Sequence, residues 1–146
     1  MMFALVCCGE DGRPLLPIPE VPDAIAATYQ ANADLYRRVG FIPPWVSYLA
    51  VDRDRAVGGG AFVGAPRHNR VEIAYFTCKE LEGLGYATRT ATELVVIARK
   101  ALPGIILSAF TLRETNASTK ILSRLGFRQV GDAKDPDAGD VWEWRT

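Results

Sequence analysis

Two glycines that separate a strand pattern from a helix pattern constrain this chain more than any other feature. Residues 71–76 (VEIAYF) alternate with a period of two, which predicts a strand. Gly83 and Gly85 then precede residues 87–102, whose apolar side chains recur at helical spacing. A Pro-Gly pair ends that helix, and residues 105–110 (IILSAF) form a nearly continuous apolar run, which is typical of a strand buried on both faces. The order strand, helix, strand predicts a parallel crossover unit.

The glycine turn is a candidate anion-binding site. The first turn of a helix presents backbone N–H groups that have no intrahelical partner, and the helix macrodipole adds partial positive charge. Because Gly83 and Gly85 carry no side chains, a phosphate can approach the backbone closely, and a diphosphate is the natural ligand. Glycines ahead of a helix are also ordinary turn residues, so the pattern alone leaves both interpretations open.

The same segment resembles the acyl-CoA loop of the GNAT superfamily of N-acetyltransferases, whose pattern is Gln/Arg-x-x-Gly-x-Gly/Ala after a strand. Gly85 and Ala87 match the last two positions. Glu82 stands where Gln or Arg is usual. This difference concerns a ligand contact from the side chain at that position, and it does not concern the contacts from the backbone N–H groups of the turn. Upstream, Glu72-Ile73-Ala74-Tyr75 resembles the Glu-Ile-Gly-Tyr strand of the branch related to ribosomal-protein N-terminal acetyltransferases. The resemblance extends from about Trp45 to Phe127 and covers most of the chain.

The resemblance implies a mixed α/β fold, with a mostly antiparallel central sheet, one parallel strand pair that splays apart, and flanking helices. It also implies acetyl-CoA as co-substrate, with backbone groups of Tyr75, Phe76 and Thr77 on the pantetheine arm between the splayed strands. The residues expected at the diphosphate are those of the glycine turn, namely Glu82, Gly83, Leu84, Gly85, Tyr86, Ala87 and Thr88.

A second point of resemblance lies downstream. Residues 115–127 resemble the Asn-x-x-Ser…Gly-Phe segment of the same branch, with Ser118 in register and Asn116 one residue late. In the family this asparagine supports the pantetheine arm or the active-site backbone, but Asn116 would also make a good helix N-cap. Many members place a tyrosine where this chain has Leu122, and that tyrosine protonates the departing thiolate. Ser118 is therefore the candidate hydroxyl for the thiolate, or else an ordinary first-turn serine.

Glu72 is the candidate general base. It is the carboxylate in the middle of the predicted strand, on the face that it shares with Ala74 and Phe76. Burial would raise the pKa of this carboxyl group and suit it to take a proton from an ammonium group, directly or through water. Related enzymes often use a carboxylate near this position, and the alternative is a solvated strand residue.

The remaining segments predict the other elements of one domain that spans residues 1–146. Strands are expected at 2–6, 45–51, 56–63, 127–130 and 141–145, and helices at 23–39 and 115–125. Gly58-Gly59-Gly60 inside a strand suggests a bulge or a close backbone approach. The acidic stretch 132–140 is expected to be a solvated, mobile loop.

Composition limits the partners. The chain has 17 basic and 17 acidic residues and a formal net charge of zero, so nothing favours a nucleic-acid or anionic-membrane partner. Cys7, Cys8 and Cys78 have neither disulfide-framework nor zinc-site spacing, so we expect no metal site, and a reducing cytoplasm fits best. No segment is long enough to span a membrane.

The resemblance implies an enzyme that transfers an acetyl group from acetyl-CoA to a primary amine by direct attack within a ternary complex. The acceptor is a small amine, a protein N-terminus or a lysine, and the enzyme is a monomer or homodimer. The alternative is a non-catalytic acyl-CoA-binding or regulatory module, which Glu82 and Leu122 motivate. A dinucleotide-binding domain would need Gly or Ala at Thr88 and an acidic residue about 20 positions further on, and neither is present.

Overall fold

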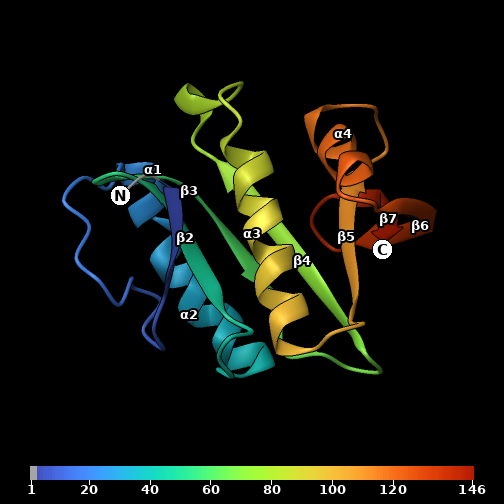
Figure 1. The fold of residues 1–146 in the computed structure, drawn as a ribbon, viewed down its shortest axis with the longest axis horizontal. Coiled ribbons are helices and arrows are strands. Elements are labelled where there is room, and N and C mark those ends of the chain that lie inside the picture. Colours follow the sequence, from blue (N-terminus) through green and yellow to red (C-terminus); the bar gives the residue numbers. More distant parts are fainter. Residues whose placement is uncertain (1–2) are drawn as a thin grey trace.

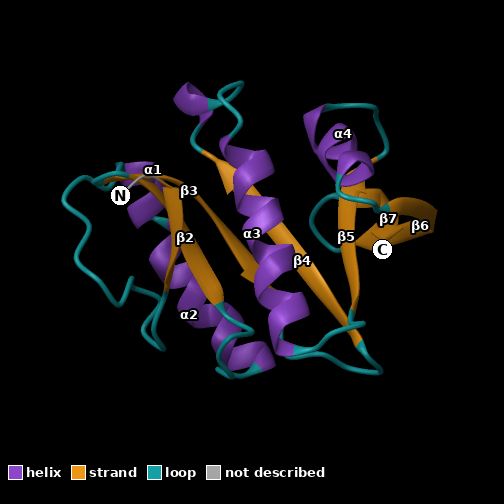
Figure 2. Cartoon of the chain, viewed as in Figure 1, coloured by secondary structure: helices purple, strands orange, loops and turns teal. Residues whose placement is uncertain are grey.

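The computed structural model describes residues 3–146, which form a mixed sheet of seven strands flanked by helices (Figures 1 and 2). The strands follow the order β1-β2-β3-β4-β5-β7-β6, and all neighbours are antiparallel except β4 and β5. The strands are β1 (Phe3–Cys7), β2 (Ser47–Asp52), β3 (Arg55–Phe62), β4 (Arg70–Thr77), β5 (Ile106–Leu112), β6 (Arg128–Asp135) and β7 (Gly139–Arg145). The predicted fold class is confirmed, and residue 2 of the first predicted strand lies outside the described residues.

The helices cover the two faces of this sheet unequally. They are α1 (Asp23–Ala26), α2 (Thr28–Val39), the short 3-10 helix η1 (Lys79–Leu81), α3 (Tyr86–Ala101) and α4 (Ala117–Arg124). Figure 2 shows α3 in front of the sheet and α2 behind β2.

The single helix predicted at 23–39 is wrong in one respect, because it is interrupted at Ala27. There the Thr28 hydroxyl donates to the Ile25 carbonyl at 2.7 Å, so a side chain occupies an acceptor within the helical register.

The parallel pair β4–β5 is short, and this shapes the site. Its register joins Arg70 to Ile106, Val71 to Leu107, and Glu72 to Ser108. Beyond the last of these pairs both strands continue, β4 to Thr77 and β5 to Leu112, without pairing with each other. The facing backbone edges are therefore without strand partners, and backbone polar groups in such a gap need another partner. The predicted splay of the parallel pair is confirmed.

The face of β4 that meets α3 can be assigned from a glycine on β3. A Cβ on Gly60 would lie 2.8 Å from the Cδ1 atom of Leu94 on α3, and Gly60 is paired with Tyr75 across β3 and β4. Tyr75 and Ile73 therefore face α3. Glu72 and Phe76 face the opposite side, where α1 and α2 cover only the part of the sheet nearer the N-terminus.

The glycine triplet in β3 is both bulged and closely approached, as predicted. The β2–β3 register shifts between Ala50 and Val51. A Cβ on Gly58 would lie 2.2 Å from the carbonyl oxygen of Phe76 on the neighbouring strand. Side chains at this position are excluded because the obstructing atom belongs to the backbone.

Alanine at Gly58 is expected to destabilise the fold, because the new methyl group would push β3 away from β4. We expect the free energy of unfolding of Gly58→Ala to fall by about 1–3 kcal/mol. Gly131→Ala is the matched control, since a Cβ there meets no atom within 4 Å, and its effect should stay within about 0.5 kcal/mol. Denaturant titration measures both variants, and equal losses would contradict a close contact at Gly58.

The prediction of a mobile acidic loop at 132–140 is wrong. Most of this stretch belongs to the β6–β7 hairpin, in which Asp132 pairs with Trp142 and Asp135 with Gly139. The Asp135 carboxylate accepts the backbone N–H groups of Asp137 and Ala138 at 2.8 and 2.9 Å, which stabilises the turn. Asp132 and Asp140 are exposed on strands and Asp137 is exposed in the turn, whereas Asp135 is half-buried.

Candidate active site

A cavity of about 830 Å³ lies beside the splayed end of β4, within the size range of small-molecule sites. Its walls come from the end of β4, the turn before α3, and the first turns of α4. Eleven of the sequence-predicted site residues line it: Tyr75, Phe76, Thr77, Glu82, Gly83, Gly85, Tyr86, Ala87, Thr88, Asn116 and Ser118. Tyr75, Phe76 and Thr77 belong to the part of β4 that is not paired with β5, so the cavity borders the strand where the parallel pair has parted.

The glycine turn has the backbone geometry of an anion cradle. Gly83 and Gly85 have φ angles of 82° and 87°, which favour glycine, and a Cβ on either would meet no atom within 4 Å. Gly85 is the N-cap of α3, and no side chain caps the first turn of that helix. The amide groups at the start of α3 are thus left for a ligand, and the residues that carry them line the cavity.

Two residues of the predicted turn, Leu84 and Tyr86, do not offer their side chains to a ligand in the cavity. Leu84 is 64% exposed and does not line the cavity. The Tyr86 hydroxyl donates to the Asp52 carboxylate at 2.6 Å, which ties the start of α3 to the end of β2. The Tyr86 side chain thus has a structural partner, and its backbone remains for the ligand.

Asn116 is the N-cap of α4, as the structural alternative suggested. Its side-chain oxygen accepts the Thr119 backbone N–H at 3.2 Å, and the Thr119 hydroxyl accepts the Asn116 N–H at 3.0 Å. This capping box orients the first turn of α4, from which Ser118 lines the cavity. Leu122 is fully buried in the core.

The sequence did not identify two cations on the cavity wall. Lys120 and Arg124 follow Asn116 at intervals of four on α4, and neither forms an ion pair with another described residue. Because residues four apart share a helix face, the spacing from Asn116 was an available signal. Both side chains are suited to phosphate groups. The other lining residues that were missed are Leu81, Glu114, Ala117 and Ile121.

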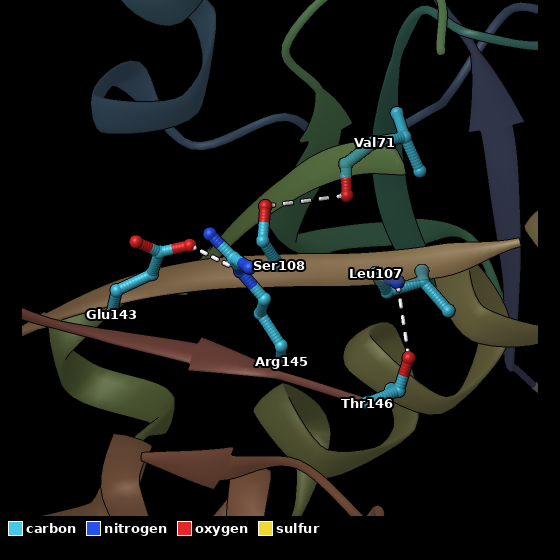
Figure 3. A network of polar contacts seen from close by, with 6 residues as sticks. All are labelled: Val71, Leu107, Ser108, Glu143, Arg145 and Thr146. Atoms are coloured by element: carbon cyan, nitrogen blue, oxygen red, sulfur yellow. Dashed lines mark hydrogen bonds and ion pairs between the residues drawn. The ribbon is translucent and has the colours of Figure 1, made fainter. Parts of the chain in front are cut away.

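Glu72 lies at the point where the strands part and does not line the large cavity. It is half-buried, and its pKa is raised, first by desolvation and then by the negative charges of Asp135 and Glu143. Figure 3 draws residues of these strands without Glu72 itself: the Ser108 hydroxyl on β5 points to the Val71 carbonyl on β4, and Glu143 on β7 pairs with Arg145 at 2.6 Å. A carboxyl group of raised pKa beside an open strand gap is suited to proton transfer.

Neither a metal-binding group nor a membrane-spanning helix is found in the described part of the chain. No cluster of three or more His, Cys, Asp or Glu residues within residues 3–146 could hold a metal ion. No helix among these residues has the length and apolar character needed to cross a bilayer.

Comparison with known proteins gives one family match. The model of the acetyltransferase (GNAT) domain matches residues 14–128. No curated protein matches this sequence.

Several solved structures have similar folds. RimL, a ribosomal L7/L12 alpha-N-protein acetyltransferase in an apo crystal form, aligns with 17% identity and a TM-score of 0.68 over 100% of this chain and 93% of its own. A spermidine N-acetyltransferase chimera from Vibrio cholerae and hSSAT aligns with 12% identity and a TM-score of 0.71, over 99% and 95%. The ribosomal-protein-S5-alanine acetyltransferase from Vibrio fischeri aligns with 20% identity and a TM-score of 0.62, over 69% and 60%, so this chain spans less than two thirds of it.

Proposed function

This chain belongs to the GNAT family of N-acetyltransferases, and from that premise we propose that it transfers the acetyl group of acetyl-CoA to a primary amine by direct attack in a ternary complex. One observation carries the proposal: the parallel strands part at Glu72 and Ser108, and the gap meets a cavity walled by an uncapped helix start. A long cofactor with a diphosphate at one end and a thioester at the other suits such a site.

The proposed placement of acetyl-CoA follows from the chemistry of the walls. The diphosphate lies on the amide groups of the Gly83–Thr88 turn, with Lys120 and Arg124 supplying positive charge from α4. The pantetheine arm runs along the unpaired edge of β4 at Tyr75–Thr77, and its amides replace the missing strand partner. The thioester then reaches the gap between the strands.

The proposed reaction needs one base and one group that stabilises the leaving sulfur. Glu72 takes a proton from the acceptor ammonium, directly or through a water molecule. The neutral amine attacks the acetyl carbonyl carbon and the new C–N bond forms. As the tetrahedral intermediate collapses, the nitrogen loses its second proton to water, and the C–S bond breaks with its electron pair on sulfur. Ser118 assists the departing thiolate from the first turn of α4.

The names of the structural relatives suggest the acceptors to test. They include enzymes for ribosomal-protein N-termini and for spermidine. Acetyl-CoA should be incubated with spermidine, benzylamine, a peptide with N-terminal alanine and an N-terminally blocked lysine peptide, and the products read by mass. A product 42 Da heavier that depends on the protein supports acetyl transfer, since an acetyl group replaces one amine hydrogen.

The alternative is a module that binds acyl-CoA without turning it over. It is favoured by Glu82 at the usual Gln/Arg position and by Leu122 where a tyrosine is common. Binding of CoA with no acceptor-dependent CoA release for any of the four amine classes would favour this alternative over the proposed reaction.

Ser118→Ala is expected to lower kcat with little change in acetyl-CoA affinity, because the hydroxyl acts on charge that develops only in the transition state. The loss should be about 10²-fold if Ser118 supplies the main hydrogen bond to the sulfur. Steady-state kinetics with the best amine measures it, and Ser123→Ala on the same helix, outside the large cavity, is the control. Wild-type turnover in Ser118→Ala would leave Ser118 as an ordinary helix residue.

A further inference from the structure

An open apolar surface lies on the sheet face that carries Glu72. Ser108 pairs with Glu72 across β4 and β5, so the β5 side chains that keep the alternation of Ser108, namely Phe110 and Leu112, share this face. Phe76 lies on the same face of β4. Phe110, Leu112 and Phe76 are 39%, 49% and 39% exposed. Large apolar side chains gathered at a surface often mark a binding site.

These side chains follow the point at which the parallel strands part. The last pair of β4 and β5 joins Glu72 to Ser108, and Phe76 and Phe110 come after it on the two separate strands. A Cβ on Gly59 of β3 would lie 2.8 Å from the Cε1 atom of Phe76, so the Phe76 ring leans over β3. Phe110 is therefore the aromatic side chain on the β5 side of the gap.

The charges on this face favour a cation at the start of the gap. The negative charges of Asp135 and Glu143 act on Glu72 and help to raise the pKa of its carboxyl group. Glu143 forms an ion pair with Arg145, whereas neither Glu72 nor Asp135 forms one within residues 3–146. The basic residues of the face pair at or before the level of the last β4–β5 pair, and they are Arg70, Arg128 and Arg145.

We propose that the acceptor is a small arylalkylamine, with its ammonium group at Glu72 and its ring on Phe110. The inference rests on the proposed acetyl transfer and names the class of its acceptor. Phe110 lies two residues beyond the level of Glu72, which is about 7 Å along a strand. An ammonium group, a two-carbon chain and a phenyl ring together have a similar length.

The apolar surface favours such an amine over the other acceptors. A ring that covers Phe110 removes apolar area of both groups from water, and two aromatic rings also pack favourably. A polyamine would bring further charges onto the same surface, and a peptide would bring its polar backbone there. Both would lose contacts with water that apolar side chains cannot replace.

The wild-type protein gives the first test. With acetyl-CoA, kcat/KM should be measured for 2-phenylethylamine, ethanolamine, spermidine and a peptide with N-terminal phenylalanine. Ethanolamine keeps the two-carbon amine and replaces the ring by a hydroxyl group. We expect 2-phenylethylamine to be the best of the four, with kcat/KM about 10–10²-fold above that of ethanolamine, which is the effect of burying one aromatic ring.

Phe110→Ala should lower the ratio of the two kcat/KM values, 2-phenylethylamine over ethanolamine, by about tenfold, and the KM for acetyl-CoA should change little. Phe110→Thr also removes the ring but keeps a residue that favours strands, so the test survives if alanine weakens β5. Val96→Ala is the control. Val96 is 41% exposed on α3, which packs on the other face of the sheet, so the ratio should stay at the wild-type value.

Three results would overturn this inference. They are an unchanged ratio in both Phe110 variants, a higher kcat/KM for any of the other three acceptors, and a wild-type dimer that dissociates in Phe110→Ala by light scattering. The last result would mean that a second copy of the chain covers the open face. With turnover of any amine, each of the three leaves acetyl transfer standing and removes only the arylalkylamine. Absence of turnover with every amine would overturn both.

Discussion

Glu72→Gln is expected to lower kcat/KM by roughly 10²–10⁴-fold, the usual range for loss of a general base. An aliphatic amine is mostly protonated at neutral pH and cannot attack until it loses a proton. Glutamine keeps the shape of the side chain and removes its basicity, so folding and CoA binding should persist. Steady-state kinetics across a pH series measures the loss, which should shrink as pH rises and more of the acceptor is already neutral.

The pH dependence gives this prediction a second readout. The pKa of Glu72 is raised by desolvation and by the charges of Asp135 and Glu143, so wild-type kcat/KM should fall with acid at a higher pH than an ordinary glutamate would give. Glu143→Gln is the matched control, since it removes one of the like charges that raise this pKa. This variant should move the acidic fall of kcat/KM to lower pH and leave the maximum value of kcat/KM unchanged. An unchanged pH profile in Glu72→Gln would mean that the base lies elsewhere.

Glu72→Gln should lower activity without lowering the stability of the fold. The folded state holds the Glu72 proton to higher pH than the unfolded chain, because the pKa of the carboxyl group is raised by folding. Ionised Glu72 therefore destabilises the fold at neutral pH, and this contribution disappears as pH falls through the raised pKa. Glu72→Gln should be at least as stable as wild type at pH 7 by denaturant titration.

Gly85→Asp is expected to abolish most of the stabilisation that CoA gives. At 100 times its dissociation constant, CoA should stabilise the wild-type protein by about 2.7 kcal/mol, a rise in melting temperature of roughly 5–10 °C. Aspartate tolerates the positive φ of 87° at this position, and a Cβ there would meet no atom within 4 Å. It would instead place a carboxylate against the diphosphate.

Gly85→Asn separates charge from bulk, because asparagine has nearly the same shape as aspartate and is neutral. Its thermal shift with CoA should lie between those of wild type and Gly85→Asp. The melting temperature without CoA reports any cost of the substitution to the fold itself. A wild-type thermal shift in Gly85→Asp would rule out the glycine turn as the diphosphate site.

Local sequence patterns determined most of the elements of this protein and the family to which it belongs. The alternation at 71–76, the glycines at 83 and 85 and the helical spacing after them each depend on residues close together in the chain, and all are confirmed in β4 and α3. The left-handed Gly126 after α4, followed by Phe127 whose N–H donates to Leu122, depends on the same kind of local rule. Such rules act through neighbouring backbone dihedrals, so the sequence suffices for them.

Tertiary contacts decided what the sequence missed. Asp132–Asp140 has the composition of a loop, yet pairing along β7 and the Asp135 turn make most of it a hairpin. Whether Asn116 caps a helix or faces a ligand was open in the sequence, and the structure shows the cap on the cavity wall.

The point at which β4 and β5 part, after Glu72 and Ser108, likewise depends on strands more than thirty residues apart. The Tyr75 hydroxyl is buried without a hydrogen-bond partner among residues 3–146, and Glu72 lies near two other carboxylates. Burial, pKa and hydrogen-bond satisfaction depend on all neighbours in space, and most of these neighbours are distant in the chain.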